Sequence, residues 1–146
     1  MHKPYYLDSS ALVKRYVSEP GSAFIDNLFE NNSSFFVSFL TYAEVYATLG
    51  RICRMGYLSS MKKNESIRDF EEDWQDLSIV DYSEVLRLSL PSLAERFPLT
   101  GADSIQLASA VSIRNNDIDL VFLTSDNKLF NAAEDFGLKV IDPSKK

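Results

Sequence analysis

The chain has 146 residues, of which 21 are acidic and 15 are basic, so its formal net charge is -6. This length suits a single domain over residues 1–146, and 45% hydrophobic and 25% charged residues are typical of a globular protein rather than a disordered one. The acidic total argues against a protein held to nucleic acid by bulk charge, because polyphosphate partners usually select a basic surface.

Short apolar runs alternate with helical patterns through the first half of the chain. The run Tyr5–Leu7 leads into Asp8 and then into a helix predicted at 11–17, for which Ser9 and Ser10 are the candidate N-caps. The elements that follow are, in chain order, a helix through residues 24–29, a strand at 35–39, a helix at 41–55, a highly charged and exposed helix at 59–74, and a strand at 77–80.

The second half continues the alternation. Residues 83–97 have a helical pattern, but Pro91 is expected to kink this helix or divide it in two. The helix predicted at 103–114 is apolar almost all round, so we expect it to be buried. A strand at 120–123, a helix at 126–136 ended by Gly137, and a strand at 138–141 complete the chain. This order predicts an α/β fold with a mostly parallel sheet.

Four acidic residues stand where such a fold can gather them. Asp8 follows the first predicted strand directly, and Asp126 comes shortly after the strand at 120–123. Glu44 lies in the first turn of the helix after the second strand, and Asp103 opens the buried helix. Ligands of an open parallel sheet bind beyond the carboxyl ends of its strands. If the strands concerned are neighbours, all four carboxylates converge on one edge of the sheet.

A structural alternative exists for three of these acids. Asp8, Asp103 and Asp126 each stand at a helix start, where a carboxylate accepts backbone N–H bonds and complements the helix dipole. The segment 100–103 also matches a capping box. For any one of the three, capping alone explains the residue, so the functional interpretation depends on their convergence.

Glu44 is harder to explain by capping. Thr41, Thr48 and Arg51 stand at helical spacing from it and form a polar stripe on an otherwise apolar helix. Such a stripe suits a carboxylate that faces a site, with Arg51 further along for an anionic substrate. A stripe that simply faces water is the alternative.

The residue types restrict the chemistry that gathered carboxylates could perform. Cys53 is the only cysteine and His2 the only histidine, which excludes an intrachain disulfide, a thiolate zinc cluster and a histidine-based triad. Packed carboxylates repel one another unless a cation neutralises them, and the hard cations that prefer oxygen ligands are Mg²⁺ and Mn²⁺. The sequence therefore predicts metal-dependent hydrolysis of phosphoesters.

Basic residues are concentrated in one part of the chain. Residues 51–68 contain five basic residues against one acid, Glu65. This segment is either a solvated helix face or a surface that contacts phosphates. The N-terminal segment lacks the apolar stretch of a signal peptide, and no apolar run approaches the roughly 20 residues of a membrane span, so we expect a cytoplasmic protein without membrane contact.

Four segments that carry these acids resemble the PIN-domain ribonucleases, and in particular the VapC toxins of bacterial and archaeal toxin–antitoxin pairs. They are Tyr6–Lys14, Ser38–Val45, Leu99–Ala108 and Leu120–Asp126. Each motif is short, but their order and spacing together are specific. Ser104 departs from the pattern, because a small apolar residue is usual there, and residues 55–76 match no motif.

The resemblance implies a three-layer α/β/α fold with a central parallel sheet, and an endoribonuclease whose catalytic acids hold Mg²⁺ or Mn²⁺. It also implies a homodimer, and a cognate antitoxin whose tail occupies the active-site groove. The residues that this resemblance concerns are Asp8, Glu44, Asp103 and Asp126 as catalytic metal ligands, and Ser10 with Thr124 or Ser125 as supporting hydroxyls. Apart from the resemblance, Lys14, Arg51 and Arg54 are candidate RNA-binding cations.

Other functions compete with this one. An aspartate-based phosphatase also begins with an acid at a strand end, but it needs a second acid where Ser10 stands. A phospho-accepting receiver domain needs a lysine late in the chain at a strand end, whereas Lys139 stands at a strand start. A non-catalytic module that binds RNA or protein is the third alternative. Three aromatic residues, which could stack on RNA bases or belong to the core, are Phe39, Tyr42 and Tyr46.

Overall fold

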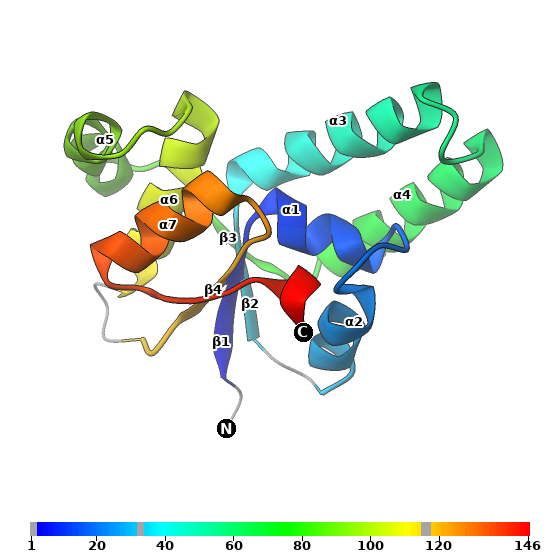
Figure 1. Cartoon of the computed structure of the whole chain (residues 1–146), viewed down its shortest axis with the longest axis horizontal. Helices are drawn as coiled ribbons and strands as arrows, with labels where there is room; N and C mark the ends of the chain where they lie inside the picture. Colours follow the sequence, from blue (N-terminus) through cyan, green and yellow to red (C-terminus); the bar gives the residue numbers. More distant parts are fainter. Residues whose placement is uncertain (1–2, 32–33, 115–117) are drawn as a thin grey trace.

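A five-stranded sheet, in which every strand pair is parallel, forms the centre of the molecule (Figure 1). The computed structural model describes residues 3–31, 34–114 and 118–146. The strand order is β3-β2-β1-β4-β5, so the first strand of the chain is the central one. The strands are β1 Pro4–Leu7, β2 Ser34–Ser38, β3 Ser78–Val80, β4 Val121–Leu123 and β5 Lys139–Ile141.

Helices cover both faces of this sheet (Figure 1). They are α1 Ser9–Leu12, which continues into the 3₁₀ turn η1 Val13–Arg15, then α2 Ser22–Glu30, α3 Phe39–Arg54, α4 Ser60–Trp74, α5 Glu84–Arg96, α6 Gly101–Arg114, α7 Asn127–Phe136 and the 3₁₀ turn η2 Pro143–Lys145. Within the described residues, no helix is both long and apolar enough to cross a membrane.

Alternate side chains of the strands supply two separate cores. Tyr6 and Phe122 pack with α5, α6 and α7, whereas Leu7, Val37 and Leu123 pack with α1 to α4. This alternation follows from the period of two along a strand, which sends neighbouring side chains to opposite faces. The predicted three-layer α/β/α fold with a parallel sheet is therefore confirmed.

The register of the central strands determines where the loops after them lie. Leu7 of β1 is paired with Leu123 of β4, and Tyr6 is paired with Phe36 of β2. Because the strands are parallel, the segments after β1, β2 and β4 leave the sheet at the same edge. The backbone N–H of Asp8 donates to the carbonyl of Leu123 (3.2 Å), which joins the ends of β1 and β4.

Helices α1, α3 and α6 each begin two residues before their predicted starts, and the first two change which residues cap or face the site. Helix α1 begins at Ser9, and its N-cap is Asp8, not Ser9 or Ser10. Helix α3 begins at Phe39 after the N-cap Ser38, so Phe39 belongs to the helix rather than to the strand. Glu44 consequently lies in the second turn of α3 and not in the first, because Ser38 accepts the N–H bond that starts the helix.

Helix α4 is less exposed than its charge suggested. Phe70 is fully buried, and its ring contacts the rings of Tyr42 (5.6 Å between centroids), Tyr46 (6.0 Å) and Trp74 (5.5 Å). These contacts bind α4 to α3, and they place Tyr42 and Tyr46 in an aromatic cluster between the two helices. Helix α4 thus has an exposed charged face, as expected, and an aromatic face that packs on α3, where Ser66 and Phe70 are buried.

Helix α5 is continuous through Pro91 and is not divided there. Leu86 and Leu93 are buried on either side of the proline and pack in the same core as α6. This packing stabilises both halves of α5 in spite of the hydrogen bond that proline removes. Helix α6 is buried as predicted. Helix α7 ends before its C-cap Gly137, as predicted, and the φ of 104° at this residue is accessible to glycine at little cost.

Candidate active site

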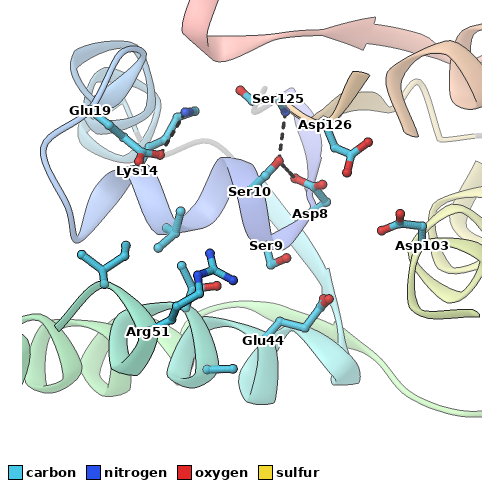
Figure 2. Close-up of a pocket in the computed structure, with 14 residues that line it drawn as sticks. Asp8, Ser9, Ser10, Lys14, Glu19, Glu44, Arg51, Asp103, Ser125 and Asp126 are labelled. Carbon is cyan, nitrogen blue, oxygen red and sulfur yellow. Dashed lines mark hydrogen bonds and ion pairs between the residues drawn. The ribbon is translucent and has the colours of Figure 1, made fainter. Parts of the chain in front are cut away.

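A cavity of about 550 Å³ lies at the edge of the sheet where β1, β2 and β4 end. Its lining includes all four acids that the sequence singled out: Asp8, Glu44, Asp103 and Asp126. They come from four parts of the chain, namely the start of α1, the second turn of α3, the first turn of α6 and the cap of α7. Figure 2 shows the four carboxyl groups turned toward one another across the cavity.

Asp8 is the most buried of the four, with 3% of its surface exposed. Its Oδ1 accepts hydrogen bonds from the hydroxyl of Ser10 (2.7 Å) and the backbone N–H of Ala11 (3.0 Å), and its Oδ2 accepts one from the hydroxyl of Thr124 (2.8 Å). Burial, with a smaller contribution from the charge of Asp126, raises the pKa of Asp8 to about 7 in spite of these bonds. Asp8 therefore caps α1 and also lines the cavity.

Asp126 and Asp103 line the cavity from the starts of α7 and α6. Asp126 caps α7 by accepting a hydrogen bond from the backbone N–H of Leu129 (3.0 Å). Asp103 does not accept at a cap; its own N–H donates to the hydroxyl of Thr100 (3.2 Å). The pKa of Asp103 is raised, first by burial and then by the charge of Asp126. The two groups thus concentrate negative charge at the cavity.

Glu44 is held by a residue that the sequence interpretation did not single out. The side-chain amide of Gln106 donates from its Nε2 to Glu44 Oε1 (2.6 Å). Burial raises the pKa of Glu44, while the bond from Gln106 lowers it. Thr48 and Arg51 line the cavity with Glu44, whereas Thr41 is fully buried, so the polar stripe of α3 faces the cavity and the interior rather than open solvent.

The three candidate supporting hydroxyls have different partners. Ser10 and Thr124 both donate to Asp8, and each also accepts a backbone N–H, from Ser125 (3.0 Å) and Asp126 (3.1 Å) respectively. The hydroxyl of Ser125 instead donates to Asp142 (2.7 Å), away from the four acids. Ser10 and Thr124 therefore connect the strand ends of β1 and β4, and Ser125 contributes its N–H.

The three candidate cations also differ. Arg51 lines the cavity and is exposed. Lys14 lines it too, but it is 6% exposed and forms an ion pair with Glu19 (3.0 Å), as Figure 2 shows. Arg54 is exposed on the last turn of α3 and lies outside the cavity lining. Arg51 is thus the best placed of the three for an anion that enters the cavity.

Two residues of this region carried too little signal to be found by sequence reasoning. Gln106 stands three residues after Asp103, a helical spacing that could have indicated a shared face. Glu19 follows Lys14 by five residues with a turn between them, a spacing that predicts no contact. Both partnerships depend on tertiary folding.

The carboxylates have the composition of a metal site without a compact arrangement. Within residues 3–31, 34–114 and 118–146, no three acidic, histidine or cysteine side chains form a group that could hold an ion as they stand. The donor set nevertheless fits a hard cation, because it consists of carboxylates, and the pKa values of Asp8, Glu44 and Asp103 are all raised. A divalent ion would relieve the repulsion that Asp126 exerts on its neighbours.

Comparisons with known proteins agree with the fold, and the matches cover most of the chain. The family model of the PIN domain matches residues 5–135. Two ribonucleases of Mycobacterium tuberculosis, VapC45 of strain CDC 1551 / Oshkosh and VapC49 of strain H37Rv, are each 31% identical to this chain over 135 residues. These residues cover 92% of this chain and 92% of each relative.

Solved structures share the architecture at lower identity. The DNA-bound VapBC of Salmonella typhimurium matches with a TM-score of 0.69 at 17% identity, over 98% of this chain and 99% of that one. VapBC-1 of nontypeable Haemophilus influenzae matches with a TM-score of 0.65 at 21% identity, over 97% and 98%. At these identities the likeness concerns the fold.

Proposed function

Because the chain belongs to the PIN-domain family, we propose that it is an endoribonuclease that uses Mg²⁺ or Mn²⁺ and acts as the toxin of a toxin–antitoxin pair. The observation that supports this most is that all four acids, Asp8, Glu44, Asp103 and Asp126, line one cavity. The two relatives named as ribonucleases support hydrolysis of RNA rather than of another phosphoester. Residues 1–146 are proposed to act as one domain, which one cooperative unfolding transition would test.

The four acids are the proposed metal ligands. When bound, Mg²⁺ or Mn²⁺ activates water and neutralises the charge that develops on a phosphodiester during hydrolysis. Asp8 would be the fixed ligand, because three hydrogen bonds hold its carboxylate and burial removes competing water. Glu44, Asp103 and Asp126 are less buried and would complete the site from the other three elements.

The chain's own residues have distinct tasks in this mechanism. Ser10 and Thr124 hold the Asp8 carboxylate toward the cavity by donating to its two oxygens. Arg51 would bind a phosphate of the RNA, because it is the exposed cation on the cavity wall, and the negative cavity otherwise repels the substrate. Lys14 would contact RNA only if it exchanged Glu19 for a phosphate. Arg54 would contact the backbone further along the strand.

Cleavage of purified RNA tests the proposal. The wild type should cut RNA with Mg²⁺ or Mn²⁺ and lose this activity in EDTA, and Asp8→Asn should be at least about 100-fold slower, since a metal supplies several kcal/mol of charge stabilisation. Asp76→Asn, which removes an exposed acid outside the cavity, should cut like the wild type. Binding without cleavage would favour a non-catalytic module, and turnover of small phosphomonoesters instead of RNA would favour a phosphatase.

The antitoxin is proposed on the basis of the solved relatives. The structures from Salmonella typhimurium and Haemophilus influenzae are of DNA-bound VapBC and of VapBC-1. Co-purification of this chain with the product of the adjacent short reading frame, and loss of cleavage in that complex, would support the pair. Cleavage that the neighbouring product leaves unchanged would contradict it.

A homodimer is proposed from the exposed apolar side chains near α5. Tyr82, Val85 and Leu88 are 56%, 65% and 65% exposed, and Ile79 of the edge strand β3 is 43% exposed. Apolar side chains gathered on a surface in this way are typical of an interface between copies. Analytical ultracentrifugation should give a dimer for the wild type and for Met61→Glu, and a monomer for Leu88→Glu. A monomeric wild type would refute this proposal.

A further inference from the structure

Gln106 is buried where the sheet meets α3 and α6. It is 1% exposed and stands one helical turn after Asp103 in α6. Its side-chain amide contacts three other residues: Oε1 accepts from the hydroxyl of Tyr6 (2.6 Å), and Nε2 donates to Thr41 Oγ1 (3.0 Å) and to Glu44 Oε1 (2.6 Å). One amide therefore connects β1, α3 and α6, the elements that carry or precede three of the four acids.

The direction of this amide is determined by its partners. A flipped amide would place a carbonyl oxygen 2.6 Å from a carboxylate oxygen of Glu44, and two acceptors at that distance repel. Tyr6 can donate its hydroxyl proton to the amide oxygen only in the observed orientation. Tyr6 is itself immobilised, because it is fully buried and its ring stacks on Phe122 with 5.2 Å between centroids.

Glu44 needs such a partner more than Asp8 does. Asp8 has a short side chain and three donors around it, whereas Glu44 has a longer side chain that is only half-buried. An unrestrained glutamate loses considerable rotamer entropy when a site orders it. In Figure 2 the Glu44 carboxyl group points into the cavity. Gln106, which donates to this carboxyl group, is buried and lies outside the cavity lining.

We propose that Gln106 is a positioning residue, which holds the Glu44 carboxylate toward the cavity while Tyr6 sets the direction of the amide. This inference rests on the proposed role of Glu44 as a metal ligand. Residues that orient a ligand from behind typically change metal affinity by about 10- to 100-fold when they are replaced. Gln106 is therefore part of the site although it does not touch substrate.

Three variants test the inference. Gln106→Met keeps the length of the side chain and removes its donor. Tyr6→Phe removes only the hydroxyl group and keeps the ring on Phe122. Ser104→Ala is the matched control. Ser104 is also buried in α6, but its hydroxyl group donates to the nearby carbonyl of Thr100 (2.9 Å) and not to Glu44.

Crystal structures of the metal-free variants provide the readout that is independent of activity. Glu44 should keep one conformation in the wild type and in Ser104→Ala, and should adopt several in Gln106→Met. Mn²⁺ binding followed by electron paramagnetic resonance should weaken about 10- to 100-fold in Gln106→Met and less in Tyr6→Phe, with kcat reduced more than KM is raised. If Gln106→Met does not fold, weaker Mn²⁺ binding by Tyr6→Phe than by Ser104→Ala decides the question.

The possible results separate this inference from the proposed function. An unmoved Glu44 in Gln106→Met, or equal Mn²⁺ binding by Tyr6→Phe and Ser104→Ala when the methionine variant is unfolded, refutes the positioning role, whatever the activity. A wild type that cleaves no RNA, combined with a disordered Glu44 in Gln106→Met, refutes the nuclease function and leaves the positioning role standing.

Discussion

Asp8→Asn should make the metal-free protein more stable above neutral pH. Asparagine is as good an N-cap as aspartate, and its amide can accept from Ala11 and Ser10 and donate to Thr124. The substitution therefore keeps the hydrogen bonds of the site and removes a buried negative charge. Asp8 is favourable for the proposed function and unfavourable for the fold without metal.

The size of the effect follows from the pKa of Asp8. The carboxyl group has a pKa of about 7 in the folded protein, against 3.8 for an unperturbed aspartate. Between these values the folded protein holds a proton that the unfolded chain has released, so stability falls as the pH rises. The penalty is absent below about pH 4 and complete above about pH 7, where it amounts to roughly 4 kcal/mol.

Thermal unfolding in EDTA between pH 5 and 8.5 measures this penalty. The advantage of Asp8→Asn over the wild type should grow with pH to on the order of 10 °C in Tm at pH 8. Asp76→Asn removes an exposed charge and should follow the wild type at every pH. Added Mn²⁺ should raise the Tm of the wild type and leave that of Asp8→Asn unchanged. A difference between Asp8→Asn and the wild type that is constant with pH would show that burial does not shift the pKa of Asp8 as argued.

Three further predictions concern the cavity wall and the α3–α4 contact. Arg51→Ala should raise KM for RNA about tenfold and reduce the salt dependence of binding, because one phosphate contact is lost; an unchanged salt dependence would exclude that contact. Lys14→Met should lower the free energy of unfolding by about 2 kcal/mol, since it leaves Glu19 unpaired but partly solvated, and denaturant titration would contradict this by showing no change. Phe70→Ala should cost about 3–5 kcal/mol in the same titration, and a cost below 1 kcal/mol would mean that the ring cluster does not stabilise α4.

The layers of the fold could be predicted because they follow from local patterns. Short apolar runs identified the strands, helical spacing identified the long helices, and the order of the two indicated the α/β class. Gly137 marked the end of a helix, as the structure shows. The boundaries were less accurate where hydrogen-bond competition decided them. Ser10 was a candidate N-cap, but its hydroxyl group bonds to Asp8, which is itself the cap.

The convergence of the acids could be predicted only on the condition that β1, β2 and β4 are neighbours in the sheet. Local patterns do not reveal strand order, because strand order depends on the whole chain. Partners far apart in sequence were not visible at all. Gln106 was hidden because a polar residue in a buried helix does not reveal which group it bonds, and Glu44 lies 62 residues away. The partner of Lys14, a candidate RNA-binding cation, was hidden for the corresponding reason, because its pairing with Glu19 depends on a turn.

The central position of β1 has a consequence for how this protein is made. Asp8 leaves the ribosome early, but the hydroxyl group of Thr124 that holds it is 116 residues later in the chain, and β4 must emerge before β1 has a neighbour on that side. Translation adds about 5–20 residues per second, so the nascent chain carries unassembled acids for several seconds. In the proposed function the cavity is therefore incomplete until β4 and the residues after it have emerged, so the nascent chain would not cleave RNA during most of its synthesis.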